Sequence, residues 1–276
     1  MKKGNSKWIT VLIFLFLTFF TSMEIAEAFF LPDTGQTQCY SIKGPLKAIT
    51  CPSSENAAAQ DGSYTINSPL YSSISNGTIK DNNTGLTWQQ QDDDIGRMWD
   101  DAVRYCDNLS LDGFTDWRLP SEKELISIMD YGRYNPSIDP IIFPNTQHSV
   151  YWSSTTTADN GDKAWTALFN FGYAYDYYSK LDTNFVRCVR GSHITFGDFT
   201  DNHNRTITDG STGLMWQQAE AALMTWASAL SYCENLSLGG YADWRLPNIK
   251  ELASLSDDSK YNPAIDSLFF PSAYAS

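Results

Sequence analysis

The chain has 276 residues, of which 42% are hydrophobic and 14% aromatic, so it can bury about two domain cores and is not a disordered chain. Its formal net charge of −13 argues against nucleic acids and anionic membranes as partners. The net charge becomes −14 when residues 1–28, with three lysines and two glutamates, are left out.

Residues 1–28 predict a signal peptide. Three lysines precede an apolar run at residues 8–20, and residues 26–28 read A-E-A, which fits an A-x-A cleavage pattern. We therefore expect the mature chain to begin near Phe29 and to reach the periplasm, the cell surface or the extracellular medium, with no membrane span after cleavage. An uncleaved N-terminal anchor is the alternative interpretation of the same apolar run.

Residues 29–70 are rich in small and polar residues and predict a leader with little core of its own. Export permits disulfide bonds. Cys39 and Cys51 flank a Gly44-Pro45 turn, so we expect them to close a local disulfide hairpin.

One long stretch of the chain occurs twice. Residues 105–120 read Y-C-D-N-L-S-L-D-G-F-T-D-W-R-L-P, and residues 232–247 read Y-C-E-N-L-S-L-G-G-Y-A-D-W-R-L-P. The offset of 127 residues is the size of a domain, so the sequence predicts a tandem duplication, with copies at residues 71–191 and 196–276.

The second copy is shorter than the first. The first copy continues past Phe143 and Pro144 into strand-like runs, whereas the printed sequence ends soon after Phe270 and Pro271. We expect a truncated second domain; a shorter domain that is complete as it stands is the alternative.

Each copy predicts two helices. Apolar residues at residues 99–109 recur with helical spacing and point Cys106 toward the core, and the second copy keeps this face. The next helix starts with capping-box spacing in both copies, at Ser121 with Glu124 and at Asn248 with Glu251.

The strand signals surround these helices. A turn at residues 81–85 joins two short strands, and three further β-like runs lie at residues 150–155, 164–171 and 184–190. The sequence therefore predicts an α+β domain with two helices against a mostly antiparallel sheet. Cys106 and Cys188 are the two cysteines of the first copy and are expected to form a disulfide, which leaves Cys233 as a free thiol.

The motifs T-G-L-x-W, G-x-x-D-W-R-L-P, Y-W-S-S-T and V-R-C-V-R-G resemble the Lcl C-terminal-like domain family, a bacterial exported domain of unknown function. More distantly, R-L-P-S-E-K-E-L and F-V-R-C-V-R resemble the formylglycine-generating enzyme group, which has a C-type-lectin-like fold. The resemblance implies a compact mixed α/β domain with a disulfide that joins its termini. The best-known member of the family is an adhesin that binds sulfated polysaccharides, a ligand that the negative charge of this chain opposes.

The sequence contains no catalytic constellation, so we expect a protein that is not an enzyme and that uses no cofactor and no metal. A thiol oxidase would need a reactive cysteine pair, and Cys106 and Cys188 are assigned structural roles. Residues 92–94, three consecutive aspartates, are interpreted as a solvated acidic turn, with a calcium site as the alternative. Arg118 and Arg245 lie beside Asp116 and Asp243 in sequence and are expected to form structural ion pairs with carboxylates, an anionic ligand being the alternative.

Residues 172–178 form a tyrosine-dense loop between the last two predicted strands, and tyrosine rings suit both sugar stacking and protein contacts. The candidate ligand-binding residues are Tyr173, Tyr175, Asp176, Tyr177, Tyr178, Trp152 and Trp165. We expect an exported recognition or adhesion module for an extracellular glycan or protein. A structural or assembly domain, whose tyrosines pack on the outer face of the sheet, is the first alternative, and a formylglycine-generating-like oxidoreductase is the second.

Overall fold

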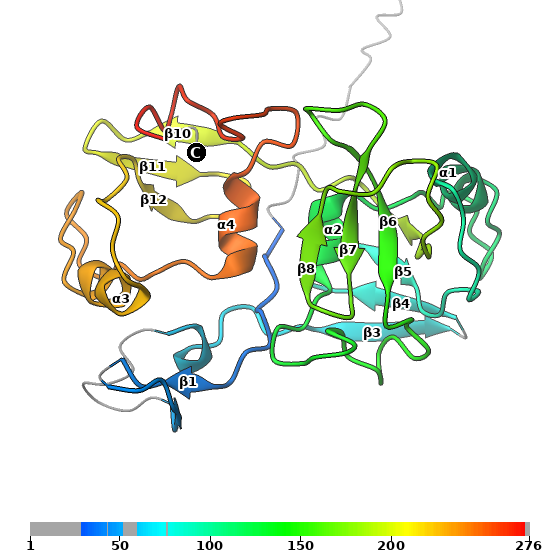
Figure 1. Ribbon diagram of the computed structural model, residues 1–276, viewed down its shortest axis with the longest axis horizontal. Helices are drawn as coiled ribbons and strands as arrows, with labels where there is room; N and C mark the ends of the chain where they lie inside the picture. The colour runs from blue at the N-terminus through cyan, green and yellow to red at the C-terminus, as the bar shows by residue number, and fades with distance from the viewer. Residues whose placement is uncertain (1–28, 43, 52–59, 76, 274–276) are drawn as a thin grey trace, which may run out of the picture.

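The computed structural model describes residues 29–42, 44–51, 60–75 and 77–273 (Figure 1). The predicted signal peptide lies outside these residues. Within them, no helix is both long and apolar enough to cross a membrane. Figure 1 shows the first copy on the right and the second copy on the left, with β1 of the N-terminal segment below the second copy.

The first copy contains two antiparallel sheets. One has the strand order β3-β4-β5-β9, formed by β3 (Tyr71–Ser75), β4 (Thr78–Asp81), β5 (Thr87–Gln89) and β9 (Val189–Arg190). The other has the order β6-β7-β8, formed by β6 (Val150–Thr156), β7 (Ala164–Leu168) and β8 (Tyr173–Tyr175). Because β9 pairs with β5, Val189 lies opposite Trp88, and the two ends of the copy meet in one sheet.

Two helices lie against these sheets, as the sequence predicts. Helix α1 (Trp99–Asp107) buries Ala102 and Cys106, and α2 (Glu122–Ser127) begins at a complete capping box between Ser121 and Glu124. These features depend on local spacing, and the structure confirms them.

The core of the first copy has two parts. One includes Trp88, Leu125, Tyr151 and Phe169 and is joined by both sheets and α2. The other surrounds the disulfide and includes Trp152 and Trp117. The protein therefore has a mixed α/β fold with several antiparallel sheets.

The second copy repeats the first half of this arrangement. Its sheet has the order β10-β11-β12, formed by β10 (Phe199–Asp201), β11 (Thr206–Asp209) and β12 (Met215–Gln217), and its helices are α3 (Trp226–Glu234) and α4 (Ile249–Leu255). Helix α4 begins at the predicted capping box of Asn248 and Glu251. Among the described residues the second copy has no counterpart of β6 to β9.

Two of the three later strand runs differ from their predictions. Strand β7 ends at Leu168, because Gly172 turns the chain with a φ of +80°, and the predicted tyrosine loop contains β8. Residues 184–190 form regular strand only at Val189–Arg190. The rest of that run makes single bridges, one of them between Tyr151 and Phe185, so it passes from the three-stranded sheet to the four-stranded one.

The N-terminal segment, residues 29–70, contacts both copies. It contains β1 (Cys39–Tyr40), β2 (Ala48–Ile49) and a short 3-10 helix, η1 (Asp61–Ser63). The Tyr131 N–H donates to the Thr34 carbonyl (2.7 Å), and the Lys250 Nζ donates to the Asp33 carbonyl (2.9 Å). The segment therefore links the turn after α2 of the first copy to α4 of the second.

Helices α2 and α4 also contact each other directly in a nearly reciprocal way. The Lys123 Nζ donates to the Ser256 carbonyl (2.5 Å), and the buried Lys250 Nζ donates to the Ser127 carbonyl (2.9 Å). Each lysine thus caps the carboxyl end of the opposite helix, where the backbone carries partial negative charge.

Candidate recognition surface

A row of exposed aromatic side chains runs along β8 and its flanking residues. Its members are Phe171, Tyr173, Tyr175 and Tyr177, which are 52%, 45%, 40% and 67% exposed. They occupy alternate positions, and Ala174 between them packs against the core. Strand alternation places Tyr173 and Tyr175 of β8 on one face. The Phe171 and Tyr177 rings, just outside the strand, stack on these two, and we call the four rings the aromatic ladder.

The rings of the ladder contact one another. Phe171 and Tyr173 are stacked with centroids 5.8 Å apart, and Tyr175 and Tyr177 are stacked at 5.9 Å. The Tyr173 and Tyr175 rings meet edge to face at 6.2 Å. The Lys163 Nζ lies 5.5 Å from the centroid of the Tyr177 ring, within the range of a cation–π interaction. The ladder is therefore an organised aromatic surface with a cation at one end.

Two of the other predicted members of this site lie beside the ladder. Asp176 is half-buried between two ladder positions. The Tyr178 ring meets the Tyr175 and Tyr177 rings edge to face, at 6.4 and 6.5 Å, and also packs against the core around the disulfide. Trp152 is fully buried, and its Nε1 donates to the Arg97 carbonyl (2.8 Å), so the prediction that it lines the surface is wrong.

Trp165 also fails to join the ladder. It is half-buried, and its neighbour Thr166 is the residue paired with Tyr175. Strand alternation therefore places Trp165 on the opposite face of β7. The sequence interpretation missed Phe171 as a member of this surface and placed it at the end of the strand-like run 164–171. The pattern F-x-Y-x-Y-x-Y at residues 171–177 is the signal that identifies it.

Strand β8 is an edge strand of its sheet. One side of its backbone pairs with β7, through contacts such as Ala167 opposite Ala174. Such an edge is a template on which another strand can pair, so the ladder lies beside a second possible contact surface.

The run of three aspartates is only partly solvated: Asp94 is exposed, whereas the Asp92 carboxylate is buried. The Asp92 side chain is 1% exposed, accepts a hydrogen bond from the Tyr151 hydroxyl, and lies 3.5 Å from the buried guanidinium of Arg187. Asp93 pairs with Arg97, and Asp94 accepts from Gln147. These aspartates therefore form ion pairs and hydrogen bonds within the first copy. Within the described residues, no group of three or more His, Cys, Asp or Glu side chains could hold a metal ion.

The arginines of the two D-W-R-L-P motifs also have structural partners. Arg118 donates two hydrogen bonds to Glu124 (both 2.7 Å), and Arg245 donates two to Glu251. The carboxylates come from the capping boxes rather than from the neighbouring aspartates. Each motif is thus tied to the helix that follows it.

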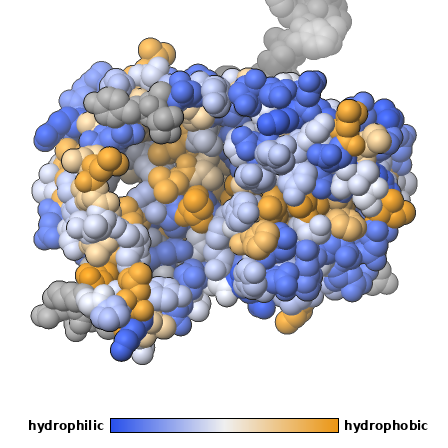
Figure 2. Space-filling model, in the orientation of Figure 1, coloured by the Kyte–Doolittle hydropathy of each residue, from blue (hydrophilic) through white to orange (hydrophobic). Residues whose placement is uncertain are grey.

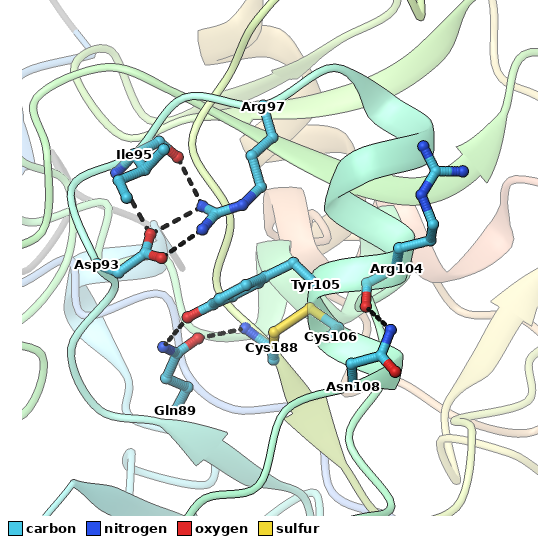
Figure 3. The surroundings of a disulfide bond; sticks show 9 residues. All are labelled: Gln89, Asp93, Ile95, Arg97, Arg104, Tyr105, Cys106, Asn108 and Cys188. Carbon is cyan, nitrogen blue, oxygen red and sulfur yellow. Dashed lines mark hydrogen bonds and ion pairs between the residues drawn. A yellow bond between two sulfur atoms is a disulfide. The ribbon is translucent and has the colours of Figure 1, made fainter.

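The disulfide predictions are confirmed: Cys39 is joined to Cys51, and Cys106 to Cys188. Figure 3 shows Gln89 between α1 and the last strand run, with its Nε2 donating to the Tyr105 hydroxyl (2.9 Å) and its Oε1 accepting from the Cys188 N–H (3.1 Å). Cys233 is half-buried and has no disulfide partner.

Comparison with known proteins agrees with the repeat seen in sequence and structure. No curated protein matches the chain. The family described as the Lcl C-terminal domain matches residues 77–190 and again residues 205–276. The two matches correspond to the two copies, the second match being the shorter, and together cover more than half of the chain, so the protein belongs to the Lcl C-terminal domain family.

Proposed function

We propose that this protein is an exported recognition module without enzymatic activity, and that its aromatic ladder binds carbohydrate. One observation carries the proposal: four neighbouring aromatic rings along the edge strand β8 and its flanking residues are exposed and contact one another. Contiguous apolar surface of this kind marks interaction sites in soluble proteins.

The chemistry of the ladder suits sugar rings. A tyrosine offers a flat apolar face for the C–H groups of a sugar and a hydroxyl tip for its oxygens. Mutual stacking restrains the rings, which lowers the entropy lost when a ligand binds. The net charge of the chain favours neutral glycans over sulfated ones. The first and last strands of the first copy lie in one sheet, and a disulfide joins its last strand run to α1. Both features support a C-type-lectin-like fold for the first copy.

A protein partner is the second candidate, and the open edge of β8 favours it. A strand of another chain could pair with β8 while its side chains pack on the ladder. In that case the protein would act in assembly, and free glycans would not bind.

A glycan array followed by titration calorimetry with the strongest neutral glycan tests the proposal. Replacing both Tyr175 and Tyr177 by alanine should weaken binding by at least about tenfold, because two stacking contacts are lost. The matched control replaces Tyr134 and Tyr261, which are exposed tyrosines outside the ladder, and should leave affinity unchanged.

Two results would contradict the carbohydrate proposal. One is equal loss of affinity in the ladder variant and the control variant. The other is a wild-type chain that binds no glycan, which would favour the protein partner. The N-terminal mass of the protein isolated from cells tests export, and cleavage before Phe29 is the expected result.

A further inference from the structure

A cavity of about 310 Å³ lies where the N-terminal segment meets the first copy and α4. Its lining comes from residues 33–35 and 69–71, from the end of α2 and the turns after it, and from Lys250 of α4. Leu70 is part of this lining and is 58% exposed, so the cavity reaches the surface there. Small-molecule sites in proteins have volumes of about 300–1,000 Å³, so the cavity is large enough for a small ligand.

Lys250 supplies a buried amine to this cavity. The residue is 2% exposed, and its Nζ donates to the backbone carbonyls of Asp33 and Ser127, both at 2.9 Å. A lysine ammonium has three N–H donors, and these two bonds use two of them. The amine is therefore held in place by neutral carbonyl groups on two sides.

The surroundings of Lys250 favour its neutral form. Burial lowers the pKa of this amine from 10.5 to about 8. Four carboxylates oppose this shift, one each from β4, the N-terminal segment, the turn after α2 and η1: Asp81, Asp33, Asp130 and Asp61. The neutral amine is the nucleophilic form of lysine, and buried lysines of this kind form Schiff bases with carbonyl compounds.

The equivalent residue of the first copy, Lys123, provides a contrast. Its Nζ forms an ion pair with Asp258 (3.1 Å) and donates to the Ser256 carbonyl (2.5 Å). An ammonium held by a carboxylate must give up that ion pair before it can attack a carbonyl carbon. One position of the repeat therefore carries an ion-paired lysine in the first copy and a cavity lysine in the second.

The rest of the lining indicates which carbonyl compounds fit. Leu70 and Ile142 give the cavity an apolar part, whereas Figure 2 shows mostly hydrophilic residues on the visible face of the first copy, on the right. Asp33, Asp130 and Asp139 also line the cavity, and their negative charges oppose an anionic ligand. A small neutral aldehyde with an apolar chain satisfies both conditions.

We propose that Lys250 binds small neutral aldehydes covalently in this cavity, as imines. The lone pair of Nζ forms a bond to the carbonyl carbon, and the two protons of the neutral amine leave with the carbonyl oxygen as water. The step involves no oxidation or reduction. No residue of the aromatic ladder lines this cavity, so neither proposal depends on the other.

The probe is butanal, with sodium cyanoborohydride to reduce each imine to a stable secondary amine. The purified full-length chain is treated briefly at pH 8, and peptide mapping measures the butylated fraction of each lysine. Lys250 should react at least ~10-fold faster than Lys123 and than the exposed Lys80. The reason is that a lysine with a pKa of about 8 is half deprotonated at this pH, and an ordinary lysine less than about 1%. In urea the three lysines should react alike.

The pH dependence separates a lowered pKa from simple access. The ratio of the Lys250 rate to the Lys80 rate cancels the common reduction step. It should fall at least ~10-fold between pH 8 and 10, because the neutral fraction of Lys250 is then almost complete while that of a lysine in water still rises.

An anionic aldehyde tests the role of the carboxylates. Relative to Lys80, Lys250 should prefer butanal over glyoxylate at least ~10-fold. Replacing Asp130 and Asp139 by asparagine should reduce this preference to below ~3-fold. The control variant Asp159→Asn removes an exposed carboxylate outside the cavity and should leave the preference unchanged.

Three results would overturn the proposal. One is a Lys250 that reacts with butanal no faster than Lys80 in the folded chain. Another is equal butylation of Lys250 and Lys123, which would show that the cavity adds nothing to the reactivity of this position. The third is equal reaction of Lys250 with butanal and glyoxylate, which would show that the lining does not select its ligand.

Discussion

The two copies share the residues that form their local structure and differ in what covers that structure. Leu125 of α2 is fully buried, whereas Leu252, its equivalent in α4, is 47% exposed. Both helices nevertheless begin at complete capping boxes and hold the preceding arginine through the same glutamate. Helix starts and turns therefore form from nearby residues, while burial of the same apolar face requires strands that arrive from far along the chain.

Replacing the equivalent cysteines should produce the largest difference between the copies in the loss of unfolding free energy. Cys106 and Cys188 are separated by 82 residues, and the chain-entropy model gives such a link about 4–5 kcal/mol. Replacing both by alanine should lower the free energy of unfolding by that amount in urea denaturation. Cys233→Ala should change it by less than about 1 kcal/mol, since this thiol has no disulfide partner. Similar losses in the two variants would contradict the comparison.

Truncating equivalent leucines should give the next largest difference. Leu125→Ala leaves a cavity in a closed core and should cost about 2–5 kcal/mol of unfolding free energy. Leu252→Ala removes a partly solvated side chain and should cost less than about 1 kcal/mol. A large loss from Leu252→Ala would show that another part of the protein covers α4 in solution.

Glu122 should make the stability of the first copy depend on pH between about 4.5 and 8. Burial, followed by the charge of Asp258, raises its pKa from 4.5 to about 8, with Lys123 opposing the shift, and its Oε2 is buried without a partner. Between these values the native state binds more protons than the unfolded state, so stability should fall as pH rises from about 4.5 through 8.

The matched variant is Glu122→Gln, which removes the ionisable group while keeping the side-chain shape. It should raise the free energy of unfolding at pH 9 by roughly 1–3 kcal/mol and flatten the pH dependence in this window. Urea denaturation at several pH values measures both effects. The equivalent residue of the second copy, Ile249, contributes no such slope, and a slope that persists in the Gln variant would assign it to another group.

The capping residues should show the smallest difference. Ser121 accepts a hydrogen bond from the Glu124 N–H (3.2 Å), and Asn248 accepts one from the Glu251 N–H (3.0 Å). Ser121→Ala and Asn248→Ala should each cost about 1 kcal/mol, because a cap acts within one helical turn. Circular dichroism during denaturation measures these losses. If Ser121→Ala lowered the free energy of unfolding and Asn248→Ala did not, the start of each helix would also depend on the strands that cover it.

The features predicted well from the sequence are those set by neighbouring residues. The capping boxes, the buried face of α1 and the turn before β5 follow from spacings of a few residues. The cysteine pairing followed from counting, since each bridged pair lies within one predicted unit.

The features predicted poorly depend on distant partners. The partner of Asp92 is Arg187, which is 95 residues away in sequence, so the acidic run was interpreted as a solvated turn. Trp152 was assigned to the surface because its neighbours in space, such as Val186 and Leu119, come from other parts of the chain. Strand β8 was interpreted as a loop, because short strands are defined by pairing as much as by their own residues.

Hydrogen exchange at two equivalent amides tests the comparison most directly. The Gln89 N–H donates to the Cys188 carbonyl, whereas its equivalent, Gln217, lies in β12, the edge strand of its sheet among the described residues. In the free chain we expect the Gln89 amide to exchange slowly, near the rate set by global unfolding, and the Gln217 amide to exchange at least about a hundredfold faster. Equal protection of the two amides would contradict the account, because it would show that the edge of β12 is already paired.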